Sequence, residues 1–500
     1  MSSLPMLTIL IPLIGALAIA AARRRPDLRE SITFFTALVL FGTVLSMVAP
    51  LLDGQEIYFK LIDVVPSMSI AFRVEPLGMI YALIASGLWI LNSLYSVGYM
   101  RANGEKHQTR FYVCFALSLS GAMGIAFAEN LFTLFIFYEM LTLSTFPLVT
   151  HKGSPEAVRS GRVYLGILVS TSVGLLFPAM VWIYTQTGNL SFQPGGVFKD
   201  AIGENGFGQG QIALLFAMCV FGIGKAAIMP IHRWLPAAMV APTPVSALLH
   251  AVAVVKAGVF SITKIAIHLF GWDTLTKYGS ASWLVYLSGF TILSASVIAL
   301  QQDNLKRRLA YSTVSQLSYI LLAVGLWALI DPSESSSRFA ITAAGMHIAV
   351  HAFGKITLFF AAGSIYTASH KTRISELDGI GFKMPITMTA FALGSISMIG
   401  IPPAAGFLSK WYLMIGAWEA HHWFAIFVLL VSTLLNAGYY LPIIWRAFFC
   451  AAPDESNFGN IQEAPWPMVV ALSVTAGGVL FIFFQPGVFL ELATLLAAAP

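Results

Sequence analysis

The sequence predicts an all-α, polytopic membrane protein, because three features agree. Its 500 residues are 57% hydrophobic and only 10% charged, whereas soluble domains carry about 25% charged residues. Apolar runs of about 18 to 25 residues, the length that an α-helix needs to cross a bilayer, recur along the whole chain. Basic residues alternate between successive loops, as the loops of a membrane protein with a fixed orientation do.

Counting the apolar runs gives about fourteen transmembrane helices. We predict them near residues 3–21, 31–51, 76–98, 111–128, 130–149, 162–185, 211–231, 244–268, 280–300, 309–330, 340–366, 386–415, 423–446 and 466–490. The two longest connecting stretches, near 52–75 and 186–210, are too short for a soluble domain. The chain is therefore predicted to be a single membrane domain over residues 1–500.

The loops predict the orientation of the chain in the membrane. The first run has no basic start and is followed by arginines, so we interpret it as a retained span and not as a signal peptide. If the loop after it is cytoplasmic, the loops on that side hold 18 Lys and Arg residues and the opposite loops hold 5. The positive-inside rule then predicts both termini on the outer side. A nucleic-acid partner is disfavoured, because the basic residues are spread over many short loops.

Two spans read as broken helices. In the seventh, "GIGKAAIMP" places Lys225 between glycines and Pro230, and in the twelfth "GIPPAAGFLSK" interrupts the helix before Lys410. Glycine and proline weaken helices, and interrupted spans in corresponding positions mark transporter repeats. Because the breaks are five spans apart, we predict two inverted five-helix repeats. The predicted parts are 1–110 (helices 1–3), 111–268 (helices 4–8), 279–446 (helices 9–13) and 447–500 (helix 14).

Six ionisable residues lie inside predicted spans, where a charge costs about 2.5 to 3.5 kcal/mol on insertion scales. They are Glu139, Lys225, Lys256, Lys264, Lys355 and Lys410. Lys264 lies near the end of its span, so we expect it to snorkel toward the membrane surface. For the other five, a functional role is the favoured interpretation, and a structural ion pair is the alternative.

Histidines extend this set. His250 precedes Lys256 on the eighth span, and His347, His351 and Lys355 on the eleventh are four residues apart in turn, which places them on one helix face. Imidazole exchanges protons near neutral pH, so the stack predicts a proton relay. A metal site is disfavoured, because Cys and carboxylate ligands are missing nearby. For any one histidine taken alone, a satisfied core residue is favoured over a metal ligand.

Several stretches resemble a known family. "FIFYEMLTLSTFPLVTHKG", "GIGKAAIMPIHRWLPAAMVAPTPVSALLHAVAVVKAG", "HIAVHAFGKITLFFAAG" and "GIPPAAGFLSKW" are similar to the proton-translocating antiporter-like subunits of respiratory complex I, membrane-bound hydrogenases and Mrp-type cation/proton antiporters. The resemblance covers nearly the whole chain and implies a fourteen-helix fold with inverted repeats.

The resemblance also implies the roles of particular residues. The family's proton-translocating positions match Glu139, Lys225, His250, Lys256, His347 or His351, and Lys410. One complex I branch has a glutamate where this chain has Lys410, and the longest members carry a lateral helix that would lie beyond Pro500. The chain is therefore most similar to the D-type subunits of Mrp Na⁺/H⁺ antiporters, and the smaller complex I and hydrogenase subunits are close alternatives.

The expected function is that of a proton-translocating subunit in a multisubunit antiporter that exchanges H⁺ for Na⁺, in a bacterial inner membrane with other hydrophobic subunits. The alternative is a proton-pumping subunit of a complex I-like NADH-quinone oxidoreductase or a hydrogenase. We hypothesise that Glu139 and Lys225 form an ion pair whose strength changes during transport. The proton would then pass through His250, Lys256 and the eleventh-span histidines toward Lys410.

No redox chemistry is expected within the chain itself. Cys114, Cys219 and Cys450 are scattered, which disfavours iron–sulfur ligation, and no dinucleotide-binding fingerprint follows a strand. No cofactor, metal or catalytic residue is therefore predicted, and enzyme activity would belong to partner subunits. A purely structural scaffold is disfavoured, because ionisable residues lie inside several spans.

Overall fold

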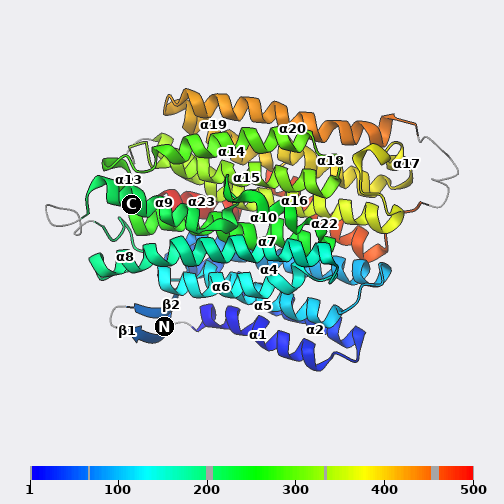
Figure 1. The fold of residues 1–500 in the computed structure, drawn as a ribbon, viewed down its shortest axis with the longest axis horizontal. Coiled ribbons are helices and arrows are strands. Elements are labelled where there is room, and N and C mark those ends of the chain that lie inside the picture. The colour runs from blue at the N-terminus through cyan, green and yellow to red at the C-terminus, as the bar shows by residue number, and fades with distance from the viewer. Residues whose placement is uncertain (1–2, 66–67, 199–206, 332–334, 452–460, 499–500) are drawn as a thin grey trace.

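Long helices that run side by side make up most of the structure, a computed structural model that describes residues 3–65, 68–198, 207–331, 335–451 and 461–498 (Figure 1). The N-terminal helices are α1 (Leu4–Ala21), α2 (Pro26–Leu45), α3 (Val48–Leu52) and α4 (Pro76–Ala102). The next are α5 (Gln108–Ala126), α6 (Leu131–Val149), α7 (Pro155–Thr171), α8 (Phe177–Thr187), α9 (Gln209–Gly222), α10 (Trp234–Ala237), α11 (Thr243–Ala247) and α12 (Val254–Lys264).

The second half of the chain continues the bundle with shorter connections. Its helices are α13 (Trp272–Lys277), α14 (Ser282–Leu300), α15 (Leu305–Trp327), α16 (Ser335–Ser369), α17 (Ile380–Lys383), α18 (Pro385–Ile399), α19 (Gly406–Glu419), α20 (Trp423–Phe449), α22 (Trp466–Phe484) and α23 (Gly487–Ala498). Short π-helical segments join α7 to α8 (Ser172–Leu176), join α11 to α12 (Leu248–Val252) and follow α12 (Ile265–Phe270).

Local sequence explains where many helices begin. Proline occupies one of the first two positions of α2, α4, α7, α18 and α22, where its missing N–H is not needed. The side chains of Asn130, Ser154 and Asn304 cap α6, α7 and α15 by accepting a backbone N–H of the first turn. Such caps satisfy donors that a helix leaves free at its N-terminus.

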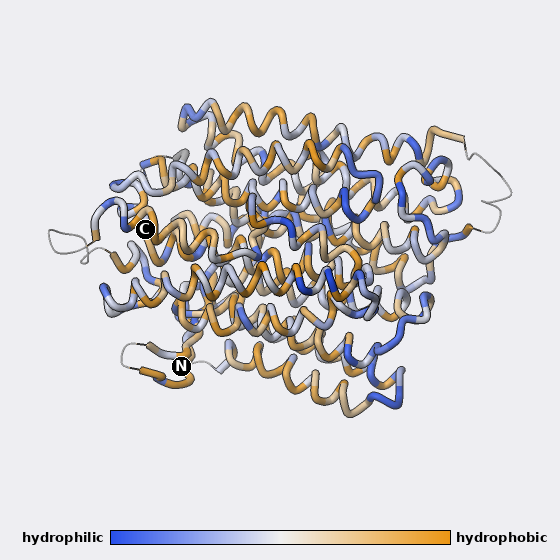
Figure 2. Tube along the Cα trace, in the orientation of Figure 1, coloured by the Kyte–Doolittle hydropathy of each residue, from blue (hydrophilic) through white to orange (hydrophobic). Residues whose placement is uncertain are grey.

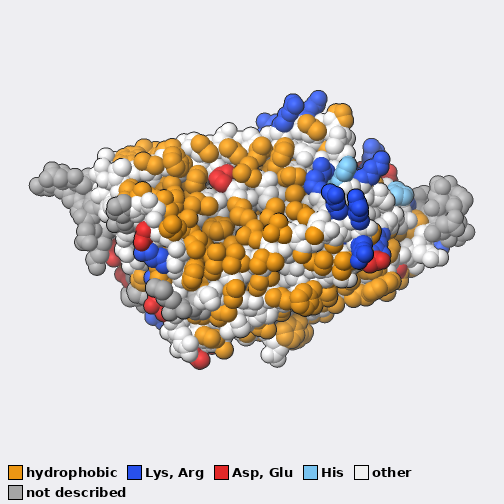
Figure 3. Space-filling view, turned by 90° about the horizontal axis from the view of Figure 1, so that it is seen from below, with side chains coloured by type: hydrophobic (Ala, Val, Ile, Leu, Met, Phe, Trp, Pro, Cys, Tyr) orange, Lys and Arg blue, Asp and Glu red, His pale blue; other side chains and the backbone are white. Residues whose placement is uncertain are grey.

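The predicted fold class is confirmed, because twelve helices of the described chain are long and apolar enough to cross a membrane. They account for every predicted span except the seventh and the twelfth, where the structure has the shorter apolar helices α9 and α18. These are the two spans predicted to be broken. The helix bodies are largely apolar (Figure 2), and most basic side chains on the face drawn in Figure 3 gather at one end of the bundle.

A β-hairpin departs from the all-α prediction. Strands β1 (Tyr58–Val65) and β2 (Met68–Arg73) pair antiparallel within the stretch 52–75 that we expected to be a connection. Half of the strand residues are β-branched or aromatic, which suits a pleated surface. The hairpin lies at the end of the bundle where both chain termini also lie (Figure 1).

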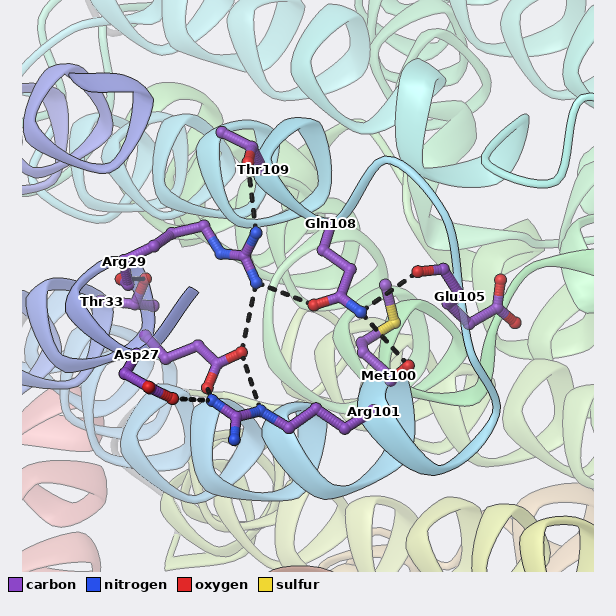
Figure 4. Close-up of polar contacts among 9 residues, drawn as sticks. Asp27, Arg29, Thr33, Met100, Arg101, Glu105, Gln108 and Thr109 are labelled. Carbon is purple, nitrogen blue, oxygen red and sulfur yellow. Dashed lines mark hydrogen bonds and ion pairs between the residues drawn. The ribbon is translucent and has the colours of Figure 1, made fainter. Parts of the chain in front are cut away.

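An ion-pair network anchors the N-terminal helices at the opposite end of the bundle. Arg101 of α4 donates to both Asp27 and Glu30 of α2, and the buried Arg29 guanidinium contacts Glu30 at 3.2 Å. Arg29 also donates to Gln108 at 2.8 Å and to Thr109 at 3.2 Å, both on α5 (Figure 4). Three helices are therefore joined by one set of charges, of which Arg29 and Glu30 are buried and Arg101 and Asp27 are exposed.

Helix α16 lies at the centre of the second half. It contacts α4, α11, α15, α18, α19, α22 and α23. All residues from 243 to 270, which form α11, α12 and the π-helical segments beside them, are also buried. The two segments with the densest predicted ionisable residues are therefore among the most enclosed parts of the bundle.

Candidate functional site

The first break in a helix presents Lys225. Helix α9 ends at Gly222, and a single 3-10 turn, Gly224–Ala226, follows it. Helix α12 passes so close to this turn that a Cβ on Gly258 would lie 2.2 Å from the Ala226 nitrogen. Only glycine permits such an approach of backbone to backbone. The indole Nε1 of Trp234 donates to the Gly224 carbonyl at 2.9 Å and satisfies an acceptor that the break frees.

The Lys225 ammonium is held by helix α6. Its Nζ donates to the Tyr138 carbonyl at 2.8 Å and to the Thr142 hydroxyl at 2.6 Å, and it lies 3.0 Å from the centre of the Tyr138 ring. The side chain is fully buried. Three neutral groups therefore surround a buried cation, which a cation–π contact and two hydrogen bonds stabilise.

The hypothesised ion pair between Glu139 and Lys225 is absent from this structure. Among the described residues, no carboxylate lies within 4.0 Å of Lys225, although Glu139 is near enough to interact with it electrostatically. Glu139 follows Tyr138 on α6 and points to a different face, which also carries the exposed side chains of Ile136 and Leu143. Consecutive residues of a helix are about 100° apart around its axis. The Glu139 side chain is therefore turned away from the Tyr138 position, where Lys225 binds.

The second break presents Lys410 to a helix end. Helix α18 stops at Ile399, Gly400 takes φ +92°, and α19 begins at Gly406. The Lys410 ammonium donates to the carbonyls of Met398 and Ile399, each at 2.9 Å. These are the last two carbonyls of α18, where the helix dipole is negative and a cation is favoured.

We expect Gly406→Ala to destabilise this break. The new Cβ would lie 1.8 Å from the Ser397 carbonyl oxygen, so the two half-helices must separate, at a cost of about 1–3 kcal/mol. The measurement is the thermal midpoint of the protein in detergent. Gly477→Ala on α22 is the matched control, since no atom lies within 4 Å of its added Cβ. Equal midpoints for the two variants would contradict the packing argument.

The predicted residues of the eighth and eleventh spans meet at the centre of the bundle. Lys256 Nζ lies 2.8 Å from His351 Nδ1, and the rings of His351 and His347 are 5.9 Å apart. His347 Nδ1 lies 2.8 Å from the Ser409 hydroxyl. The His347 ring stacks on the Tyr319 ring, with 5.6 Å between their centres. Lys410 contacts the same tyrosine, since its Nζ lies 4.8 Å from the centre of the Tyr319 ring. Lys256 and Lys410 are thus connected through two histidines and a tyrosine.

Lys355 forms a branch of this cluster. Its Nζ donates to the Ser312 hydroxyl at 2.8 Å, to the Tyr440 hydroxyl at 3.0 Å and to the Leu309 carbonyl at 3.2 Å. Ser312 also bonds Tyr439 at 2.9 Å. The lysine is fully buried, and every one of its three N–H donors has an acceptor.

Several buried polar atoms in the cluster have no hydrogen-bond partner among the described residues. They are both ring nitrogens of His250, the Nε2 atoms of His347 and His351, and Gln316 Oε1. The His250 ring instead packs on Phe359 at 4.6 Å. Buried polar groups in native proteins are satisfied by protein or by ordered water, so we expect ordered water at these nitrogens.

The structure places the eight predicted residues in two groups. The larger group is Lys256, His351, His347, Lys355, His250 and Lys410; His351 lies within electrostatic range of the other histidines and of Lys256 and Lys355. The smaller group is Glu139 and Lys225. The groups meet where Gly258 of α12 touches the backbone of Lys225. The roles of all eight remain predictions.

The prediction that Lys264 snorkels is wrong. The lysine is fully buried, and its Nζ lies 2.9 Å from Glu75 Oε2 and donates to the Ala128 carbonyl at 2.6 Å. Burial raises the pKa of the Glu75 carboxyl, but Lys264, His268 and Arg73 together hold it below its ordinary value. The Ala128 carbonyl, the Glu75 carboxylate and the Phe192 ring, whose centre is 4.8 Å from Nζ, enclose an ammonium that the sequence places at a membrane boundary.

We expect Glu75→Gln to destabilise the protein by about 3–5 kcal/mol, because it leaves Lys264 as a buried charge without a counter-ion. The depressed pKa of Glu75 also gives a sign to the pH dependence. The ion pair stabilises the fold above the unfolded-state pKa of about 4.3, and this contribution is lost as the pH falls through the folded-state pKa. Denaturant unfolding of wild type and variant from pH 7 to pH 3 measures the loss of stability and its pH dependence. The control is Asp63→Asn, which removes the exposed Lys60–Asp63 ion pair.

Sequence reasoning missed several polar groups that lie around the predicted lysines and histidines. The missed residues are Tyr138, Thr142, Ser312, Gln316, Tyr319, Ser409, Tyr440 and Glu75. A signal was present on the tenth span, where Ser312, Gln316 and Tyr319 are spaced for one helix face. Neutral polar residues are common in membrane helices, so this spacing alone does not indicate which lysine they serve.

Together, the fold and the site define a multi-pass membrane protein with a central axis of ionisable residues. Residues 128–436 match the family described as NADH:quinone oxidoreductase/Mrp antiporter, TM. The chain therefore belongs to this family, as an antiporter-like membrane subunit of Mrp or complex I-like type.

Curated relatives of both kinds match the chain. It is 30% identical over 93% of its length to the N-type subunit of the NADH-quinone oxidoreductase of Desulforudis audaxviator, of which the match covers 89%. It is 31% identical over 85% of its length to the A-type subunit of the Na⁺/H⁺ antiporter of Alkalihalophilus pseudofirmus, and the match spans only 54% of that longer protein.

Solved structures share the fold at low sequence identity. A chain of the Mrp complex from Dietzia sp. aligns with a TM-score of 0.85 at 22% identity, covering 99% of this chain and 96% of that one. A chain of the archaeal membrane-bound sulfane sulfur reductase aligns with a TM-score of 0.86 at 22% identity, covering 100% and 98%. Both neighbours are parts of multisubunit membrane complexes.

Proposed function

We propose that this chain is the proton-translocating subunit of a multisubunit antiporter that exchanges H⁺ for a monovalent cation such as Na⁺. The observation that carries the proposal is the buried connection Lys256–His351–His347–Tyr319–Lys410. Ionisable groups inside a membrane are costly and mark proton relays and ion pathways. Their unsatisfied nitrogens leave places for water to carry protons between side chains.

The two lysines at broken helices would load and unload this path. The Lys410 ammonium lies at the last carbonyls of α18, where the helix dipole favours the charged amine. Lys225 follows the end of α9, and its ammonium bonds the carbonyl and the hydroxyl that α6 offers. A change in the distance between half-helix and lysine would alter how readily each amine releases its proton. Inverted repeats over 111–268 and 279–446 remain our proposal for why the chain has two such lysines.

The position of Glu139 supports the proposal that a neighbouring protein chain covers this face of α6. It is partly exposed and lies beside exposed apolar residues, where contact with lipid would cost about 2.5–3.5 kcal/mol for a charged carboxylate. A hydrophobic partner that covers this face would remove that cost.

We also propose that the chain lies in a bacterial inner membrane with both termini on the outer side. The termini lie at the end of the bundle away from the basic loops (Figures 1 and 3), and basic loops favour the cytoplasmic side.

One observation favours a second candidate function, proton pumping in a complex I-like oxidoreductase or hydrogenase. The match to the N-type subunit of the NADH-quinone oxidoreductase covers 89% of that protein, whereas the match to the A-type antiporter subunit covers 54%. The same relay would serve either complex, because the energy source would lie in partner subunits.

Purification of the tagged chain with its native partners tests the two functions. The antiporter proposal predicts only hydrophobic partner subunits, no flavin or iron–sulfur absorbance, and proton movement in vesicles that depends on added Na⁺. Co-purifying redox subunits together with proton movement driven by NADH or another electron donor would replace the first proposal with the second. Absence of proton movement under both conditions would contradict both.

A further inference from the structure

A wide cleft opens at the end of the bundle that carries the basic loops. Its volume is about 1030 Å³. The N-terminus of α7, the segment before α11, the N-terminus of α15, the C-terminal half of α16 and the connection after it form its walls. The predicted relay does not include any of these lining residues.

The lining is strongly basic. Six cationic residues, Lys152, Arg159, Lys306, Arg307, Lys371 and Arg373, face only two carboxylates, Glu156 and Asp303. Among the described residues, no ion pair within 4.0 Å joins Lys152, Arg159, Lys306, Arg307 or Arg373 to a carboxylate. So many like charges around one space repel one another unless an anion lies between them.

The nearby carboxylates offset these charges only in part. Asp303 interacts electrostatically with Arg373, and its two oxygens accept hydrogen bonds from Ser375, at 3.0 Å from its N–H and 2.9 Å from its hydroxyl. Glu105, which interacts electrostatically with Lys152 and Lys306, is partly shielded from solvent, and burial raises the pKa of its carboxyl. Within the described part of the chain, the Lys306 ammonium donates to a neutral group, the Ala241 carbonyl, at 2.6 Å.

Two helix N-termini strengthen the positive potential. The capping residues Ser154 of α7 and Asn304 of α15 both line the cleft, so two helix dipoles end there with their positive poles. Guanidinium and ammonium groups next to helix N-termini are the usual surroundings of a bound phosphate. Arg159 and Arg307 add planar donors that match phosphate oxygens in pairs.

We propose that this cleft binds a phosphate group, presented by an anionic phospholipid headgroup or by a soluble phosphate compound. The lipid source has structural support, because Val163 of the cleft is 37% exposed. From α7, exposed apolar side chains continue along the π-helical segment and α8 at Val173, Phe177 and Val181. This surface would contact the acyl chains of a lipid whose headgroup lies in the cleft. The open basic end would equally admit a soluble ligand from the aqueous phase.

The test compares binding by the purified full-length chain, with its co-purifying subunits, and by variants. The cleft variant is Arg159→Gln with Arg307→Gln. The control is Lys106→Gln with Lys383→Gln, which removes two exposed charges outside the cleft. One arm measures retention of phosphatidylglycerol against phosphatidylcholine by native mass spectrometry. The other measures pyrophosphate binding by calorimetry.

We expect the cleft variant to lose about tenfold or more in affinity in one arm, while the control keeps the wild-type value. Loss in the lipid arm identifies a headgroup, and loss in the pyrophosphate arm identifies a soluble ligand. Glu156→Gln should strengthen the same binding, because it removes a negative charge from the cleft. The proposal is overturned if the wild type binds neither probe, if cleft and control variants lose affinity equally, or if Glu156→Gln weakens binding.

Discussion

Replacing Lys410 by arginine is expected to lower proton flux on the order of 100-fold, the lower range of what a positioned proton-transfer group contributes. Arginine keeps a positive charge beside the last carbonyls of α18, to which Lys410 now donates at 2.9 Å. Its guanidinium does not release a proton in proteins. The variant therefore separates proton transfer from the structural task of satisfying the end of a broken helix.

The measurement is dye-reported acidification of vesicles that carry the complete complex. Lys383→Arg, an exposed lysine at the basic end of the bundle, is the matched control and should retain wild-type flux. Lys410→Ala should lose flux and also destabilise the protein, because it leaves two helix-end carbonyls unsatisfied. Normal flux through the Lys410→Arg complex would remove Lys410 from the path.

Lys225→Ala is expected to reduce flux to a similar extent. The substitution removes the amine at the break after α9 and leaves the Thr142 hydroxyl and the Tyr138 carbonyl without their donor. Thr142→Val tests the surroundings of the amine, since it deletes one hydrogen bond at nearly constant volume. We expect that variant to keep the fold and to shift the pH profile of transport, because the charged amine loses a stabilising acceptor.

Glu139→Gln completes this series, and Lys277→Ala, an exposed lysine, is its control. If the carboxylate controls the proton affinity of Lys225, the Gln variant loses flux although no ion pair joins the two residues in this structure. The exposed face of Glu139 makes its effect depend on the covering partner, so the complete complex must be used. Unimpaired flux in both Glu139→Gln and Lys225→Ala would sink the proposed mechanism.

The sequence predicted the breaks well because their causes are local. Gly400 adopts φ +92°, and Gly406 lies so close to the Ser397 carbonyl that a Cβ would not fit between them. Both features depend on the absence of a side chain at these glycines. The hairpin of residues 58–73 was missed, since short strands give a weaker signal than apolar runs of membrane length. Glu139 and Lys225 were predicted in the right segments, but the hypothesised ion pair between them is absent from this structure. The rotation of α6 decides this contact, and the sequence does not show that rotation.

By itself, the sequence determined the membrane class, the approximate positions of the spans, the two breaks and the short set of ionisable residues inside the spans. Each depends on hydrophobic length, on glycine and proline, or on the cost of a charge in hydrocarbon, which neighbouring residues along the chain decide. Only the tertiary structure decided which charges meet: Lys256 with His351, 95 residues away, Lys264 with Glu75, and Lys225 with neutral groups of α6 in place of Glu139. Such contacts depend on helix rotation and packing between segments distant in the chain, and a rotation of one residue step, about 100°, exchanges one partner for another.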